Sequence, residues 1–389
     1  MIRELSEKYR NFTAGNLSKL IGIKSLSLQE AEVQKELMRQ MQEAGFDNVR
    51  MDGLGNVIGR IGKGKRVLAF DAHMDTVDLG NLADWNFDPL SGEIAGGYVH
   101  GRGSVDQKGG AASFVTAGRI LKDIAFDRDI SIFFVGSVME EDCDGLCWKY
   151  LIEEEGLKPD AVVVTEPTNM NLYRGQRGRM EMQIEFFGRS CHGSAPERGE
   201  NAIYMASRSA LEIEKLNERL EADDFLGKGT ITASELISES PSLCAVADYA
   251  RLHLDRRLTW GETREGALRQ VEELLGGMRA EVKVLNYEES SFTGLRYGME
   301  KYYPCWKLPE NHKMIKNAAL VFESLFNKAP HIGKWTFSTN GVSINGIYGI
   351  PVIGFGPGNE IFAHAPNEKV PVDHLVGASA FYAALACSF

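Results

Sequence analysis

The chain has 389 residues, of which 43% are hydrophobic and 25% are charged, and its formal net charge is -11. This length exceeds what one compact core usually holds, so we expect two domains. The negative charge and the lack of a basic stripe argue against nucleic-acid binding, because phosphate contacts need clustered lysine and arginine. No segment approaches the roughly 20 apolar residues that span a bilayer, which argues against a membrane protein.

The beginning of the chain and its cysteines bear on where the protein works. The first ten residues are charged and helical in pattern, and they lack the apolar stretch of a signal peptide. The six cysteines are scattered, with neither the spacing of a zinc finger nor that of a disulfide framework. We therefore expect a cytoplasmic protein, because that compartment keeps thiols reduced.

Helical and strand-like segments alternate along roughly the first 178 residues. The predicted elements are helices with a short edge strand up to residue 54, strands at 56–61 and 66–70, a helix at 110–122, a strand at 131–135, a helix at 147–155 and a strand at 160–164. The first two of the longer strands are predicted to form a hairpin across residues 62–64. The later strands are apolar almost throughout, as in a sheet covered on both faces. This alternation predicts an α/β fold with a mostly parallel sheet flanked by helices.

The pattern changes near Gly178. Residues 180–186 alternate between polar and apolar side chains, which indicates a sheet with one face exposed to water. The elements predicted from there on are that strand, a helix at 201–220, strands at 230–237 and 249–254, a helix at 263–275 and a strand at 280–286. Their βαββαβ order forms a compact two-layer unit. Because a buried strand at 351–355 and a terminal helix from about residue 372 follow, we predict a discontinuous main domain, residues 1–178 and 289–389, with an inserted domain at 179–288.

Acidic and histidine residues stand just beyond the strand-like segments of the main domain. They are His73, Asp75, Asp106, Glu140, Glu141, Glu166 and His364. Open α/β sheets bind ligands at the carboxyl ends of their strands. Five carboxylate and imidazole donors are what two zinc ions that share a bridging carboxylate require, and the set contains that many. The sequence therefore predicts a two-zinc site, and cobalt or manganese suits similar ligands.

His73, Asp75 and Asp106 have separate predicted tasks within this site. The first two are two residues apart, so they share a face of a strand. We predict that His73 binds metal and that Asp75 orients it, because a metal-bound imidazole usually donates its second N–H to a carboxylate. Asp106 lies in the glycine-rich segment 101–110, where a phosphate-binding loop is the rival interpretation. That rival fails because an aspartate would repel phosphate and the Gly-Lys-Ser/Thr ending is absent. With both carboxylate oxygens available, Asp106 is predicted to bridge two metals.

Glu140 and Glu141 follow the apolar run at residues 130–138. Adjacent residues at a strand end point in different directions, so one carboxylate can bind metal while the other stays free as a base. An acidic helix N-terminus, favoured by the helix dipole, is the alternative interpretation. Glu166 follows a buried strand in the same manner, and His364 is the last predicted ligand.

The chain resembles the M20 family of zinc-dependent amidohydrolases and peptidases. That family includes acetylornithine deacetylase, succinyl-diaminopimelate desuccinylase, aminoacylase and carboxypeptidase G-type enzymes, and within it the sequence is most similar to a subgroup of hydrolases linked to selenium or purine metabolism. The matching motifs cover nearly the whole chain in the order of the family: His73-Met-Asp75, Gly101-Arg-Gly-Ser-Val-Asp106, Glu140-Glu141, Glu166-Pro-Thr, His192-Gly-Ser-Ala-Pro and His364-Ala-Pro-Asn-Glu368.

The resemblance implies how the metal ligands divide. One zinc would take His73 and Glu166, and the other would take Glu141 and His364. Asp106 would bridge the two ions. Glu at position 166 is typical of deacylases and carboxypeptidase-like members, whereas aminopeptidases tend to have Asp there, and this favours N-acyl amino acids or similar amides.

The resemblance also implies roles outside the metal ligands. Glu140 would be the general base and acid. The inserted domain would be a lid that dimerises, and its His192 would reach the site of the neighbouring subunit and polarise the scissile carbonyl. An arginine of the Asp255-Arg-Arg257 segment would grip a substrate carboxylate, and we favour Arg257 over Arg256.

One further segment is expected to line the substrate pocket. Thr339 and Asn340 stand where relatives often have Ser/Thr-Asp-Gly. The asparagine removes a charge, so the substrate preference of relatives does not transfer directly.

The sequence as a whole predicts a zinc-dependent hydrolase that cleaves a small linear amide and works as a homodimer. A dipeptidase or aminopeptidase of the same fold is the nearest alternative. A ureido (carbamoyl) amide hydrolase is suggested by the subgroup alone. A non-catalytic binding protein that kept the fold belongs to a different class, and the presence of Glu140 beside every ligand argues against it.

Overall fold

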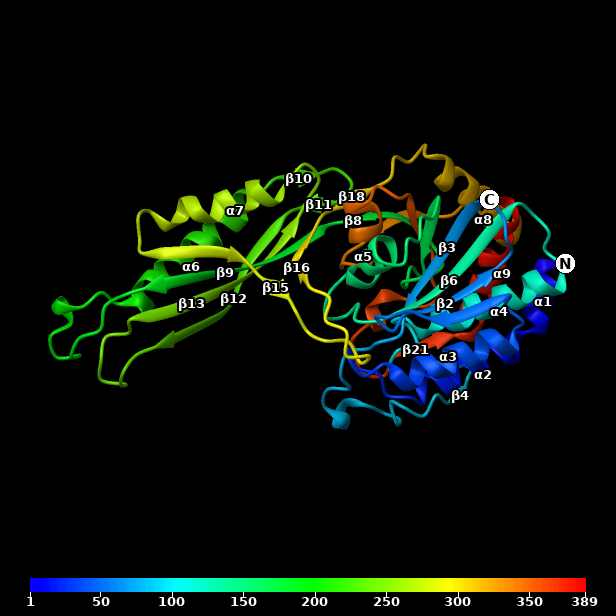
Figure 1. Cartoon of the computed structure of the whole chain (residues 1–389), viewed down its shortest axis with the longest axis horizontal. Coiled ribbons are helices and arrows are strands. Elements are labelled where there is room, and N and C mark those ends of the chain that lie inside the picture. The colour runs from blue at the N-terminus through cyan, green and yellow to red at the C-terminus, as the bar shows by residue number, and fades with distance from the viewer.

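A computed structural model describes residues 1–389, and Figure 1 shows a larger body that carries both chain termini and a smaller unit that projects from it. The sheet of the body has the order β1-β2-β6-β3-β7-β20-β8-β18, with β19 also paired to β8. Its strands are β1 (Asn48–Met51), β2 (Val57–Ile61), β3 (Arg66–His73), β6 (Ile130–Ser137), β7 (Ala161–Val164), β8 (Leu172–Gln176), β18 (Trp306–Lys307), β19 (Ile332–Trp335) and β20 (Val352–Gly354).

The four central strands of this sheet, β6, β3, β7 and β20, run parallel, while β1, β2 and β18 pair antiparallel toward the edges. Helices cover both faces of this sheet. One face carries α1 (Ile2–Lys8), α2 (Arg10–Ile21), α3 (Ala31–Glu43), α4 (Lys108–Asp123), α8 (Lys313–Phe326) and α9 (Val372–Ser388). The other face carries α5 (Leu146–Glu153) and the π-helical turn η4 (Val342–Ile347). The predicted mostly parallel sheet flanked by helices is confirmed.

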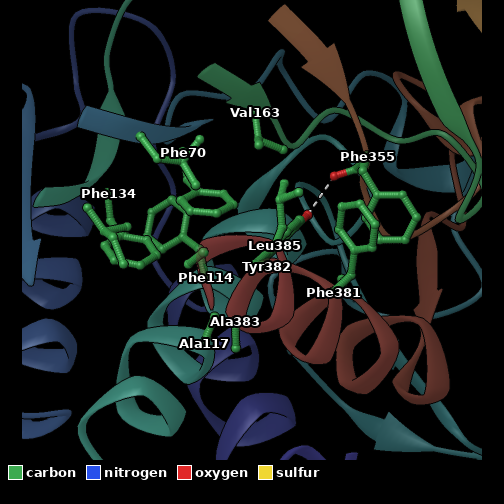
Figure 2. Packing of buried hydrophobic residues seen from close by; sticks show 14 of the residues in the cluster. Phe70, Phe114, Ala117, Phe134, Val163, Phe355, Phe381, Tyr382, Ala383 and Leu385 are labelled. Atoms are coloured by element: carbon green, nitrogen blue, oxygen red, sulfur yellow. Dashed lines mark hydrogen bonds between the residues drawn. The ribbon is translucent and has the colours of Figure 1, made fainter. Parts of the chain in front are cut away.

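Alternation along the buried strands feeds two separate cores. Phe70 and Val163 point into the core beneath α4 and α9, whereas Ala69 and Val162, one position earlier on each strand, point into the core beneath α5. Figure 2 shows the first core, where aromatic rings from the sheet meet α9 and the hydroxyl of Tyr382 donates to the carbonyl of Phe355 at 2.7 Å. Such two-sided burial fixes the strand ends in space, and the candidate site stands on those ends.

The predicted hairpin across residues 62–64 is wrong. β6 lies between β2 and β3 in the sheet, antiparallel to the first and parallel to the second. The connection between β2 and β3 instead passes beside the start of β6, where a Cβ on Gly64 would lie 1.7 Å from the backbone nitrogen of Ile130. A strand that is apolar on both faces is most stable in the interior of a sheet, so a distant segment displaced the local partner.

The projecting unit is built on an antiparallel sheet of order β12-β13-β9-β14. Its elements are β9 (Gly178–Phe187), α6 (Ala202–Arg219), β12 (Thr230–Glu239), β13 (Tyr249–Leu258), α7 (Arg264–Glu272) and β14 (Ala280–Val284), which is the predicted βαββαβ order with a small hairpin, β10 (Ala222–Asp223) and β11 (Gly227–Lys228), added before β12. Both helices lie over one face in Figure 1, and the apolar residues of β9 and β13 pack beneath them.

The exact division of the chain into domains stays a prediction. Strand β17 (Tyr302–Tyr303) comes after the predicted boundary at residue 288, yet it pairs with β9. Shorter pairings complete the fold, namely β4 (Ile94–Ala95) with β5 (Tyr98–His100), β5 with β21 (Lys369–Pro371), and β15 (Asn286–Tyr287) with β16 (Met299–Glu300). None of the helices combines the length and the apolar character that crossing a membrane requires. All six cysteines are unpaired.

Candidate metal centre

Three parallel strands bring the first predicted residues to one edge of the larger sheet. His73 is the last residue of β3, Glu140 follows β6, and Glu166 follows β7. Because β3 pairs in parallel with both β6 and β7, their carboxyl ends meet. The sequence placed these residues after strands, and the tertiary fold brings those strands side by side.

One group of possible ligands surrounds His73. Its Nε2 lies 2.9 Å from Oδ1 of Asp106 and 3.5 Å from Oε1 of Glu166. All three side chains are buried. Asp106 comes from the loop before α4, so this group joins two strand ends with a loop of the same domain.

A second group surrounds His364, which lies between the 3₁₀ turn η5 (Glu360–Phe362) and β21. Its Nε2 is 2.9 Å from Oε2 of Glu141 and 3.3 Å from Oδ2 of Asp106. Asp106 therefore offers one carboxylate oxygen to each group, and the two groups of three possible ligands share only this residue.

The side chains fit two divalent cations. Oε1 of Glu140 and Oε2 of Glu166 are buried and have no hydrogen-bond partner, and a buried carboxylate oxygen without a partner is costly. The donors are imidazole nitrogen and carboxylate oxygen, which are the ligands that zinc and similar ions take. His73, Asp106 and Glu166 could hold one ion, and Asp106, Glu141 and His364 could hold the other.

The pKa values of these groups reflect how many carboxylates crowd together. Hydrogen bonds with Asp106 and Glu141 raise the pKa of His364 to about 10. Burial disfavours the ionised form of Asp106, but hydrogen bonds from His364 and His73 outweigh it and hold the pKa of Asp106 below its usual range. Burial, followed by the charge of Asp106, raises the pKa of Glu166 well above its ordinary value. Without metal, the raised pKa values of His364 and Glu166 favour their protonated forms, and a metal cation would supply positive charge in place of those protons.

Asp75 makes contacts other than the predicted one. Nδ1 of His73 lies 2.9 Å from the backbone carbonyl of Asp75, whereas the nearer carboxylate oxygen is 3.6 Å away. That carboxylate instead accepts the backbone N–H groups of Glu140 at 3.2 Å and Glu141 at 3.0 Å, and the hydroxyl of Ser27 at 2.7 Å. The chain turns after β3, so the backbone carbonyl of Asp75 reaches the imidazole of His73. The side chain of Asp75 holds the turn that carries Glu140 and Glu141.

Glu368 holds the Asp106 loop in place, a task that sequence reasoning missed. Its Oε1 accepts the backbone N–H groups of Val105 at 2.7 Å and Asp106 at 3.1 Å. Its Oε2 accepts the N–H of Gly103 at 3.1 Å and the guanidinium of Arg102 at 2.8 Å. The residue stood in the motif of His364, which was the signal available. Its fully buried carboxylate couples the position of Asp106 to the segment that carries His364.

A cavity of about 320 Å³ opens onto the metal ligands, and loop residues of the body line it together with residues of two strands of the projecting unit. Arg257 of β13 is among the lining residues. Arg256 points to the opposite face of β13, where its side chain is fully buried and contacts Glu262 and Gln270. The alternation of the strand therefore separates the two arginines, and Arg257 is the one that faces the cavity; its predicted binding of a substrate carboxylate stays a prediction.

Thr339 and Asn340 do not line this cavity, contrary to prediction. Asn340 is buried. Its side-chain Nδ2 donates to Asp71 at 2.9 Å, and its side-chain Oδ1 accepts the backbone N–H of Gly145 at 2.9 Å. Thr339 is also buried and donates to Gln176 at 2.6 Å. The cavity is lined instead by the preceding Phe337 and Ser338. A side-chain amide at position 340 can donate to Asp71, whereas an ionised aspartate there would place two carboxylates in contact.

His192 lies outside this cavity in its own chain. It is exposed in the projecting unit, where it forms an isolated bridge with Ala245 and its Nδ1 accepts from Ser194. The sequence assigned this histidine to the site of a neighbouring subunit, and that assignment stays a prediction.

A sequence model described as peptidase family M20/M25/M40 matches residues 69–388. The chain belongs to this family. Members of the family are metallohydrolases that act on amide or peptide bonds.

Two curated relatives indicate the range within the family. The Uncharacterized protein YgeY of Escherichia coli (strain K12) is 50% identical over all of this chain and 97% of its own. Acetylornithine deacetylase of Proteus mirabilis (strain HI4320) is 26% identical over 82% of this chain and 78% of its own. The M20 resemblance read from the motifs is therefore confirmed.

A solved structure supports the fold. The Bacillus subtilis YXEP protein, described as a dinuclear metal binding peptidase from the M20 family, superposes with a TM-score of 0.72 over 98% of both chains at 15% identity. The body and the projecting unit of this chain thus follow an arrangement that occurs in the family.

Proposed function

We propose that this protein is a two-metal hydrolase that cleaves the amide bond of a small N-acyl amino acid or a related compound. The observation that carries this proposal is Glu140. Glu140 is buried and lines the cavity, its Oε1 has no hydrogen-bond partner, and it lies beside two groups of possible ligands that share Asp106. A free carboxylate in that position suits a general base rather than a structural residue.

The ligands would hold two zinc ions, and cobalt or manganese would serve in their place. His73 and Glu166 would hold one, Glu141 and His364 the other, and Asp106 both. When bound, the ions would polarise the scissile carbonyl and lower the pKa of the attacking water.

The protein itself would move the proton and position the substrate. Glu140 would accept the proton of the attacking water at its free Oε1 and deliver it to the leaving amine nitrogen. Arg257 would bind a carboxylate of the substrate through its planar guanidinium. Asp75, through the backbone N–H groups of residues 140 and 141, would keep both glutamates in position.

A hydrolysis screen tests this proposal. Zinc-loaded protein would be given N-acetyl, N-succinyl and N-carbamoyl amino acids and free-amine dipeptides at equal concentrations. We expect the N-acyl amino acids to have the highest kcat/KM. Preferred cleavage of dipeptides would make the protein a peptidase, and preferred cleavage of N-carbamoyl compounds would make it a ureido hydrolase. Less than one zinc per chain with no cleavage across the panel would show a non-catalytic binding protein.

We further propose that the protein is a homodimer joined through the projecting unit, which would act as a lid. Strand β12 is an edge strand of that sheet, and residues 232–236 are exposed along it. An uncovered edge of this length readily pairs with another strand. Pairing between two copies would also give His192, which does not line the cavity of its own chain, a route to the cavity of its partner.

A further inference from the structure

Two arginines, Arg179 and Arg257, stand directly opposite each other where the projecting sheet meets the cavity. They are paired residues of the antiparallel strands β9 and β13, and both line the cavity. Like charges directly opposite on neighbouring strands are destabilising. This pairing places two positive charges side by side at the wall of the cavity, where an anionic ligand could meet both.

Carboxylates on the same strands partly offset this repulsion. Glu181 and Asp255 are also directly opposite each other, two residues along from the arginines. Arg179 contacts Glu181, and Nη2 of Arg257 donates to Oδ2 of Asp255 at 3.1 Å. Neither carboxylate lines the cavity. The sheet therefore anchors each guanidinium on one side and leaves the other side facing the cavity.

Asp144 of the main domain lies across from Arg179 without closing a hydrogen bond. Its Oδ2 is 3.6 Å from Nη1 of Arg179 and has no hydrogen-bond partner, although the side chain is only 6% exposed. Nε of Arg179 is likewise buried without a partner. Nε is also 4.0 Å from Oδ1 of Asp255, while Nη1 is left without a hydrogen bond, and Asp144 attracts Nη1 without saturating it.

We propose that Arg179 acts together with Arg257 as a paired guanidinium receptor for the carboxylate of the substrate, and that Arg179 is a specificity-determining residue. This inference rests on the proposed function and specifies its substrate class: an amide compound that must carry a free carboxylate. A neutral analogue would leave the cavity-facing sides of the two guanidinium groups without an anion from the ligand. Sites that lose such partners reject the analogue strongly.

The test measures binding rather than turnover. Zinc-loaded Glu140→Gln protein is titrated in a calorimeter with N-acetylglycine and with its neutral amide, N-acetylglycinamide. We expect the carboxylate compound to bind at least about tenfold more tightly, since two charge-assisted contacts distinguish the pair of probes. Arg179→Gln and Arg257→Gln should each remove most of that preference. Equal affinity for the two probes, or binding of neither, would overturn the proposal.

Three further variants separate recognition from structure. Arg251→Gln is the matched control, because Arg251 lies on β13 away from the cavity and pairs with Glu235 at 3.9 Å; the preference should be unchanged. Arg179→Lys keeps a positive charge and should retain part of the preference for the carboxylate compound. It serves as the second variant should Arg179→Gln fold poorly. Asp144→Asn should keep the preference. If it instead abolished the preference as Arg179→Gln does, Arg179 would be a structural partner of Asp144 and the proposal would be wrong.

The outcome is independent of the hydrolysis screen. If the protein cleaves none of the screened amides but prefers the carboxylate probe, the paired receptor is supported and the proposed function is wrong. If the protein cleaves N-acyl amino acids but binds the two probes equally, the proposed function is supported and the paired receptor is wrong.

Discussion

Glu140 and Glu141 are adjacent in sequence, yet their carboxylates lie in different surroundings. Glu141 contacts His364 at 2.9 Å, within one of the two ligand groups. Glu140 is more deeply buried, its nearest cation is Nε2 of His73 at 3.9 Å, and its Oε1 has no partner. Two adjacent acids can therefore divide into a ligand and a base, because the turn after β6 directs them to different sides.

Glu140→Gln should separate metal binding from turnover. The amide keeps the size of the side chain but cannot take a proton from water, so we expect kcat to fall by about 10²- to 10⁴-fold. Two metals per chain should remain, as measured by elemental analysis. Glu154→Gln, an exposed acid on the surface, is the control and should leave kcat unchanged. A Glu140→Gln protein with near wild-type kcat would contradict the assignment of the base.

The metal-free protein should depend on pH through His364. Hydrogen bonds with Asp106 and Glu141 raise its pKa from 6.5 to about 10. The imidazolium therefore stabilises the fold fully below about pH 6.5, and this contribution is lost as pH rises toward about 10. Zinc must displace the same proton, so zinc affinity should rise with pH across the lower part of this window.

Two measurements check this pH dependence. The melting temperature of metal-free protein should fall between about pH 6.5 and 8.5, and the zinc affinity from calorimetry should rise over that range. His364→Ala should flatten both curves, whereas His374→Asn, outside the ligand groups, should leave them sloping. A zinc affinity that does not change with pH would show that His364 is neutral before the metal binds.

At the scale of elements, the loop before α4 depends on a residue distant in sequence. Glu368 accepts hydrogen bonds from three backbone N–H groups of the loop and from Arg102. The loop has several glycines and no secondary structure of its own, so these bonds define where Asp106 lies. The two ligand groups therefore keep their spacing because Glu368 ties the loop to the segment of His364.

Glu368→Gln should weaken both the fold and the metal site. The change leaves the buried Arg102 without its anion, and breaking a buried pair of this kind typically costs about 3–5 kcal/mol. Metal affinity should fall about 10- to 100-fold, because outer partners orient the ligands. Urea unfolding and zinc titration measure the two effects. Glu212→Gln, which removes an exposed pair with Lys215, should change stability by less than about 1 kcal/mol. Unchanged zinc affinity in Glu368→Gln would show that Asp106 is positioned by other contacts.

At the scale of the whole molecule, the cavity belongs to both parts of the chain. Metal ligands and Phe337 come from the body, and Arg179 and Arg257 come from the projecting unit. The proposed chemistry and the proposed recognition thus reside on different sheets. Movement of the unit relative to the body would change the distance between them, which is the physical basis for a lid.

The proposed dimer predicts that a charge on β12 disrupts assembly. Leu236 is 46% exposed on this edge strand. Leu236→Lys places a charge against the partner strand, so light scattering after gel filtration should give the mass of one chain instead of two. Leu320→Lys, at an exposed leucine of α8 in the body, is the control. If the wild-type protein is already a monomer, or if Leu236→Lys remains a dimer, the proposed interface is wrong.

Much of the architecture follows from local patterns. Helices and strands could be placed because their apolar residues recur with the period of each element. The pairing of β2 with β3 could not, because β6, some 60 residues later in the chain, takes the place between them. Sheet order depends on which segments are buried on both faces, and a turn signal between two strands carries no information about a later competitor.

The site divides in a similar way. His73, Glu140 and Glu166 could be found because they follow apolar strands, and parallel strands end at a common edge. Thr339 and Asn340 were expected from a motif to line the pocket, yet both are buried and neither lines the cavity. Asp144 and Arg179 carry no local sign of their positions, and the motif that contains Glu368 gives no sign of its task, since each of the three acts on a residue from another part of the chain.

Residue chemistry and periodicity along the chain are thus sufficient for the fold class and for the acids and imidazoles that could hold metal, and the resemblance of the motifs is sufficient for the family. Those features depend on side-chain type and on the alternation of single elements. Register and burial decided the rest. The register between β9 and β13 sets Arg179 against Arg257, and the alternation of β13 turns Arg257 to the cavity and Arg256 away from it. Contacts between distant segments form only when the whole chain packs, so no local pattern records them.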